Sequence, residues 1–308
     1  MEKSKPTKEQ IEREKALNKL EKDYEKEIIR NYQLALKELR AMIAFIYEKY
    51  DGSWIELNRY NRYVKLEKEI AEEIRKLTGK NAKTLIKGLM DVYEEAYYRT
   101  AYVLTNAVQT DLMFVLLDSE LVRKAIENPL DKVGFLARNK ELHQILLRQL
   151  RENLTQSFIL GESYRTAAKR IKERMDVGAS RSLTIARTEM HRTRQQAKLD
   201  SLKEGAERGI IIKKHWLATI DSRTRDRHGR LDGVQVDLDE HFEIDGYRAK
   251  APGLFGVAEM DINCRCDVLE VVEGFDPRYR RVKDVGIVRY ATYDEFINKG
   301  IKHVKVAD

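Results

Sequence analysis

The chain has 308 residues, carries a formal net charge of +7 at pH 7, and is 35% charged and 42% hydrophobic. This length suits two domains, and the apolar content excludes a chain that is disordered throughout. A charge of +7 does not by itself establish a nucleic-acid partner. Because the N-terminus lacks an apolar signal segment and no run approaches the roughly 20 apolar residues of a membrane span, we expect neither export nor a membrane partner.

The first 160 residues are predicted to form a bundle of long helices. Apolar residues recur at steps of three and four from Leu17 to Tyr50, which is the pattern of one face of an amphipathic helix. The Asp51-Gly52-Ser53 segment should end this helix. A second helix is expected to stop at Gly79, and a third to run from about Asn81 to Leu117.

Helical patterns continue beyond Pro129 and Gly134, which punctuate the next connection. Three further helices are predicted: about Asn139–Leu160, ended by Gly161; Tyr164–Met175, with Ser163 as its cap; and Ser180–Gly205, after a turn at Asp176–Gly178.

A small β-containing module is predicted to follow. Residues 211–220 are β-branched and aromatic, Asp232-Gly233 and Asp245-Gly246 are typical of hairpin turns, and Val268–Val272 is expected to be a strand. The tail contains a short helical pattern near Asp294–Asn298. We therefore expect an α+β chain, with a bundle of long helices in residues 1–160, a helical-plus-β module in residues 161–273 and a tail in residues 274–308.

The two cysteines, Cys264 and Cys266, are candidate metal ligands. They are separated by one residue, which is poor geometry for a disulfide. Two thiolates could be joined by His228 and by His215, His241 or Asp221 to give the four ligands of a structural zinc site; beyond this possible ion, no cofactor is expected. The spacing is shorter than that of the common zinc knuckle, and the alternative is that both cysteines are plain core residues.

Basic residues are concentrated before this module. Residues 151–200 hold eleven Lys plus Arg against six Asp plus Glu, whereas residues 211–273 hold nine against thirteen. Basic side chains at helical spacing could follow DNA phosphates; the alternative is a solvated face in which Arg187 pairs with Glu189 or another carboxylate. The candidates for DNA contact are Arg165, Lys169, Arg170, Lys172, Arg174, Arg187, His191, Arg194 and Lys198.

One ordered run of residues lies between His215 and Cys266, and it comprises Trp216, Asp221, Arg225, His228, Asp232, Gly233, Cys264, Arg265 and Cys266. This run resembles the C-terminal region of the phage head morphogenesis family, the Mu F-like minor head proteins. The resemblance extends from about Gly161 to Glu273. It implies a structural protein of a tailed phage or prophage, located in the virion interior after assembly in the host cytoplasm. It also implies contact with the portal, other head proteins and DNA, and an effect on assembly, packaging or ejection.

The residues themselves favour a structural role for this run. Asp221 and Arg225 are expected to form an internal clamp. An enzyme, such as a metal-dependent hydrolase or nuclease, would use His228 as a general base oriented by Asp232. No nucleophile stands in a recognised activating context and no glycine-rich phosphate loop occurs, so we predict that the chain is not an enzyme. A helical interaction protein without DNA binding is the third alternative, favoured by the acidic module.

Overall fold

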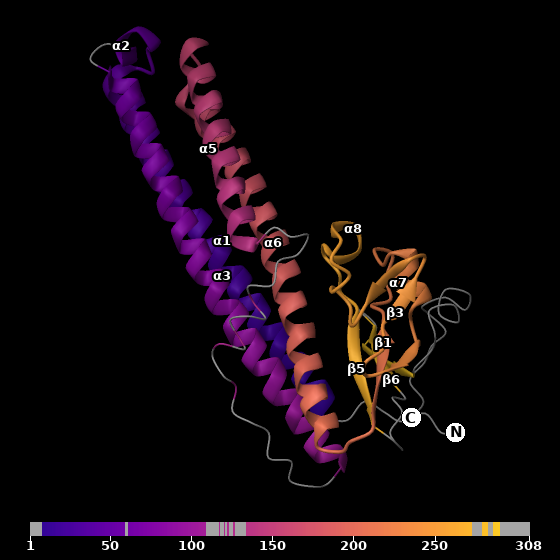
Figure 1. Cartoon of the computed structure of the whole chain (residues 1–308). Coiled ribbons are helices and arrows are strands. Elements are labelled where there is room, and N and C mark those ends of the chain that lie inside the picture. Colours follow the sequence, from indigo (N-terminus) through magenta and orange to yellow (C-terminus); the bar gives the residue numbers. More distant parts are fainter. Residues whose placement is uncertain are drawn as a thin grey trace. The chain divides into compact units, whose positions relative to one another are not determined.

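The computed structural model describes residues 8–58, 61–108, 134–272, 279–282 and 286–289, together with residues 117, 120, 122 and 126. Long helices occupy the first part of the chain and short antiparallel strands the last, as the colours of Figure 1 show. The predicted α+β class is therefore confirmed. Among the described residues, no helix is long and apolar enough to cross a membrane.

Within the described residues, two pairs of predicted helices are each one continuous helix. Helix α1 spans Lys8–Tyr50 and ends where Asp51 and Gly52 take positive φ values of 49° and 63°, as expected. The short α2 spans Trp54–Asn58. The remaining long helices are α3 at Arg62–Val108, α5 at Phe135–Ile159 and α6 at Tyr164–Glu207.

Two predicted helix breaks are wrong. Gly79 lies inside α3, where its missing side chain faces open space and the buried Leu77 and Leu85 continue the apolar stripe on either side. Gly178 lies inside α6, and a Cβ there would lie only 3.1 Å from Tyr32 Cε1 and 3.2 Å from Leu146 Cδ2. Tertiary packing thus overrides the weak helix propensity of glycine, which at position 178 permits close approach rather than a turn.

The chain divides into two compact units. The helical unit comprises residues 22–88 and 133–187, and the mixed unit comprises residues 1–21, 89–132 and 188–308. Because α1, α3 and α6 each contribute to both, this division does not follow the order of the chain. The domain boundaries near residues 160 and 273 stay predictions.

The mixed unit contains a three-stranded antiparallel sheet in the order β2-β1-β5. Strand β1 spans Ile212–Leu217, β2 spans Gln235–Asp237 and β5 spans Asp267–Val272, so the two predicted long strands are confirmed. The register places Trp216 opposite Val268 and His215 opposite Leu269 on β5. The C-terminal end of β1 therefore lies beside the N-terminal end of β5, and the two cysteines immediately precede β5.

Short elements surround this sheet. Strands β3 (Phe242–Ile244) and β4 (Tyr247–Ala249) form a hairpin whose turn residues, Asp245 and Gly246, have φ values of 47° and 82°, as the Asp-Gly signal predicts. Asp232-Gly233 is a turn but joins no hairpin, because helix α7 (Asp226–Arg230) intervenes between β1 and β2. The described residues also include α8 at Ala258–Asp261 and an unpredicted hairpin of β6 (Tyr279–Val282) and β7 (Gly286–Arg289). The predicted helix near 294–298 falls outside the described residues.

The core of the mixed unit is centred on Trp216, whose side chain is fully buried. Its ring packs edge-on against Phe242, with centroids 5.2 Å apart, and lies 5.9 Å from Phe255. Leu199 from α6 and Val268 from β5 complete the contact between the helix and the sheet. Both cysteines belong to this same core.

Candidate metal centre

His228, Cys264 and Cys266 converge in the core of the mixed unit. Helix α7 carries His228 on its buried side, and the two cysteines lie in the segment between α8 and β5. The Nδ1 atom of His228 is 3.6 Å from Cys264 Sγ and 3.5 Å from Cys266 Sγ. All three potential ligand atoms lie within 4.8 Å of one another, and all three residues are buried.

Aromatic rings enclose the histidine of this cluster. The His228 ring packs edge-on against Trp216 at 5.6 Å and stacks on Phe255 at 5.9 Å. Hydrogen bonding from Cys264 is the main reason that the pKa of Cys266 falls well below its ordinary value, and His228 contributes in the same direction. The hydrogen bond between the two cysteines, together with burial, raises the pKa of Cys264. The cluster therefore brings two cysteine sulfur atoms and an imidazole nitrogen together, a donor set that suits a soft divalent cation.

The other predicted metal ligands lie elsewhere. His215 is buried on β1, where its Nδ1 is 3.3 Å from Gln235 Nε2. Asp221 is engaged in an ion pair, and His241 is half-buried before β3. Within the described residues, no further His, Cys, Asp or Glu completes the cluster of three.

Asp221 forms a clamp, but with a different arginine from the one predicted. Arg265 donates to both carboxylate oxygens of Asp221, with Nη2 2.7 Å from Oδ1, and this pairing holds the pKa of Asp221 well below its usual value. Arg225 instead donates from Nη2 to the carbonyl oxygen of Ile262 at 2.6 Å. The expected pair was wrong because Arg265 lies between the two cysteines, where the fold brings it against Asp221.

The remaining signature residues hold the C-terminal end of β1. Asp232 Oδ1 accepts the main-chain N–H of Ala218 at 2.7 Å, and the N–H of Gly233 donates to the carbonyl oxygen of Trp216 at 2.9 Å. Gly233 has a φ of 85°, a conformation that favours glycine. Together with the Asp221–Arg265 clamp, these bonds fix the loops that carry His228 and the cysteines.

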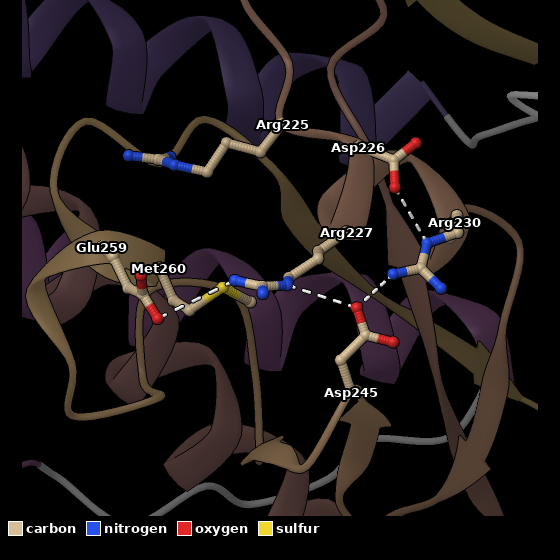
Figure 2. Close-up of a pocket in the computed structure, with 7 residues that line it drawn as sticks. All are labelled: Arg225, Asp226, Arg227, Arg230, Asp245, Glu259 and Met260. Atoms are coloured by element: carbon tan, nitrogen blue, oxygen red, sulfur yellow. Dashed lines mark hydrogen bonds and ion pairs between the residues drawn. The ribbon is translucent and has the colours of Figure 1, made fainter.

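The outer side of α7 lines a surface cavity of about 500 Å³. Figure 2 shows that Arg227 and Arg230 point toward Asp245, while Asp226 and Glu259 flank them. The Nε atom of Arg227 is 3.2 Å from Asp245 Oδ2, and that of Arg230 is 3.0 Å from Asp226 Oδ2. These charges largely neutralise one another, so the cavity offers no strong preference for an anion or a cation.

The predicted basic stripe on α6 is not a surface feature. His191, Arg194 and Lys198 are buried in the mixed unit, and burial lowers the pKa of His191 to about 4, which leaves it neutral at pH 7. Lys198 Nζ lies 2.7 Å from both Asp267 Oδ1 and Glu14 Oε1. Buried side chains cannot contact DNA phosphates, so the prediction that these three residues belong to a DNA-binding stripe is wrong.

A network of buried charges therefore joins α6 to the sheet and to the start of α1. Arg194 also contacts Asp267, and Arg13 donates from Nη1 to Glu270 Oε1 at 2.9 Å. Burial acts to raise the pKa of Asp267, but Lys198 and Arg194 outweigh it and hold that pKa below its ordinary value. Arg13, Glu14 and Glu270 were not predicted as members of this network, because no local pattern links residues more than 170 positions apart.

The other basic candidates lie in the helical unit. Arg165, Lys169 and Lys172 are exposed and fall at i, i+4 and i+7 on α6, which places them on one face. Lys172 pairs with Asp176 at 2.5 Å. Three more candidates do not extend this face: Arg170 pairs with Glu162, Arg174 is exposed on the opposite side of the helix, and Arg187 pairs with Glu25 rather than Glu189.

Comparison with known proteins gives one family and two relatives. The sequence model described as "Phage Mu protein F like protein" matches residues 148–269. The chain is 30% identical over 300 residues to "Minor head protein GP7" of Bacillus phage SPP1, a match that spans 93% of this chain and 96% of that protein. It is also 34% identical over 232 residues to "NAD(+)--arginine ADP-ribosyltransferase EFV" of Enterococcus faecalis, which covers 74% of this chain and 48% of that protein. No solved structure matches the chain.

Proposed function

Because this chain belongs to the phage Mu protein F-like family and has a structural role in the phage head, we propose that it is a minor component attached to the portal inside the head, where it contacts DNA. The observation that carries this proposal is the match along nearly the whole length of both this chain and a minor head protein. The same proposal includes contacts with other head proteins, synthesis in the host cytoplasm, and an effect on assembly, packaging or ejection.

Portal attachment predicts which particles contain the protein. Heads purified from the phage or prophage that encodes the chain should hold a few copies, as measured by quantitative mass spectrometry. Heads assembled without the portal protein should lose most of these copies, because the proposed attachment site is missing. The major capsid protein in the same samples serves as the internal reference. Undiminished incorporation into portal-free heads would reject portal attachment while leaving a head role intact.

DNA contact is assigned to the exposed face formed by Arg165, Lys169 and Lys172. For each phosphate that is no longer neutralised, the slope of log affinity against log salt concentration should fall by about 0.9 on duplex DNA. The triple variant Arg165→Gln, Lys169→Gln, Lys172→Gln should therefore reduce that slope by about 2 to 3, measured in a titration at several salt concentrations.

A matched control distinguishes this face from nonspecific charge. Lys80, Lys83 and Lys87 are exposed on α3 of the same unit and follow a similar spacing. Their replacement by glutamine removes the same charge and should leave the slope nearly unchanged. An equal reduction in both triple variants would show that only net charge matters, and no salt-sensitive binding by the wild type would favour an interaction protein that does not use DNA.

We infer that the chain acts without catalysis. The minor head protein covers the chain almost end to end, whereas the match to the transferase accounts for about half of that protein's length. For the hydrolase or nuclease alternative, His228 would have to reach a substrate, but its side chain is buried against Trp216 and Phe255. DNA recovered from the binding titrations, with zinc added, should therefore be uncut.

A further inference from the structure

We propose that His228, Cys264 and Cys266 bind one divalent, thiolate-preferring metal ion, of which zinc is the best fit. The ion would fasten the short helix α7 to the segment that enters β5. This assignment concerns the internal construction of the mixed unit and does not depend on portal or DNA contact.

The distances between donor atoms match a tetrahedral metal. Zinc bonds to thiolate sulfur at about 2.3 Å and to histidine nitrogen at about 2.0 to 2.1 Å, so tetrahedral angles place sulfur and nitrogen about 3.5 Å apart. The observed separations from His228 Nδ1 are 3.6 Å to Cys264 Sγ and 3.5 Å to Cys266 Sγ. A single ion could therefore contact all three atoms with little movement of the side chains.

Plain core packing explains the two cysteines but not the histidine. Cysteine behaves as a small apolar residue when buried, whereas an imidazole in an apolar core incurs a desolvation cost that a phenylalanine would avoid. His228 is only 2% exposed, and its Nδ1 points at the two sulfur atoms rather than at a carbonyl or carboxylate. A metal ion bound by Nδ1 and the two sulfur atoms would explain why an imidazole is buried at this position.

The surroundings favour a structural ion over a catalytic one. Trp216 and Phe255 pack against His228, and both cysteines are at most 5% exposed, so a substrate could not reach the ion without displacing the core. The two loop segments that carry the histidine and the cysteines contain little regular structure. Their helices are α7, with five residues, and α8, with four. Such loop-rich segments are where a metal contributes most to folding.

The full-length protein tests this assignment directly. The wild type is purified after expression with added zinc, dialysed, and analysed for bound metal by mass spectrometry; about one zinc ion per chain is expected. Exchange for cobalt should give the intense ultraviolet band of thiolate-to-cobalt charge transfer. Cys264→Ser, Cys266→Ser and His228→Gln should each reduce the bound zinc severalfold, whereas His241→Gln, a histidine in the same module but outside the cluster, should retain it.

A second measurement covers variants that fail to fold. On the wild type, the two thiols should be protected from alkylation while zinc is bound and should react after a chelator removes it, with alkylation sites identified by peptide mass. The proposal is overturned if the folded wild type takes up no stoichiometric zinc or cobalt. It is also overturned if the cysteine variants fold and keep the full metal content.

Discussion

Replacement of Asp267 by asparagine is expected to reduce the free energy of unfolding of the mixed unit by about 3–5 kcal/mol. Asparagine has nearly the volume of aspartate, so the loss would not come from a cavity. Lys198 and Arg194 would instead be left buried with one carboxylate fewer to balance them. Removing one partner of a buried ion pair is costly because the remaining charge stays out of water.

The two tryptophans of the chain make this measurement specific to one unit. Trp216 lies in the mixed unit and Trp54 in the helical unit, so in a Trp54→Phe background the tryptophan fluorescence comes from Trp216 alone. Denaturant midpoints and slopes of Asp267→Asn are compared with those of Asp237→Asn. Asp237 pairs with Lys213, but both side chains are more than half exposed, so this control should cost less than about 1 kcal/mol. Equal costs for the two variants would contradict the buried network.

Replacement of Trp216 by alanine should cost about 3–5 kcal/mol, the range found for large aromatic residues in protein cores. The side chain is fully buried and touches Phe242, Phe255 and His228 at once, so its loss would leave a cavity bounded by the sheet, the β3-β4 hairpin and α7. Thermal and denaturant unfolding followed by far-ultraviolet circular dichroism would measure the effect.

The matched substitution is Trp54→Ala. Trp54 is only partly buried on α2, where it packs edge-on against Tyr63 at 5.2 Å, so its removal should cost distinctly less. In the Trp216→Ala protein, the fluorescence of Trp54 reports on the helical unit. A destabilisation at position 216 no larger than that at position 54 would mean that the Trp216 cluster is not the core of the mixed unit.

Much of the helical architecture could be predicted, because an apolar stripe at steps of three and four has one simple structural solution. The stripe from Leu17 to Tyr50 and the Asp-Gly hairpin turn at residues 245–246 are cases in which local chemistry suffices. Gly79 and Gly178 show where it does not. A glycine that ends a helix and one inside a continuous helix have the same local signature, and only the packing of the whole helix distinguishes them.

The candidate site was predictable in its chemistry more than in its contacts. Residue type alone indicates His228, Cys264 and Cys266 as metal ligands, and the structure brings these three together while leaving His215 on β1. The basic residues of α6 illustrate the opposite case. Arg194 and Lys198 have helical spacing that suits either an exposed stripe or an internal network, and the carboxylates that decide between them, Glu14 and Asp267, lie far away in the sequence.

Because α1, α3 and α6 each belong to both compact units, recombination within the gene would disrupt both units. The mixed unit draws its residues from three separated stretches of the chain, and the helical unit draws its own from two. A single recombination crossover between residues 14 and 270 would therefore exchange fragments of units rather than whole ones, and would separate Arg13 from Glu270 and, before residue 198, Glu14 from Lys198. Genes for such a protein should be inherited as complete blocks, with crossovers tolerated at their borders and selected against within them.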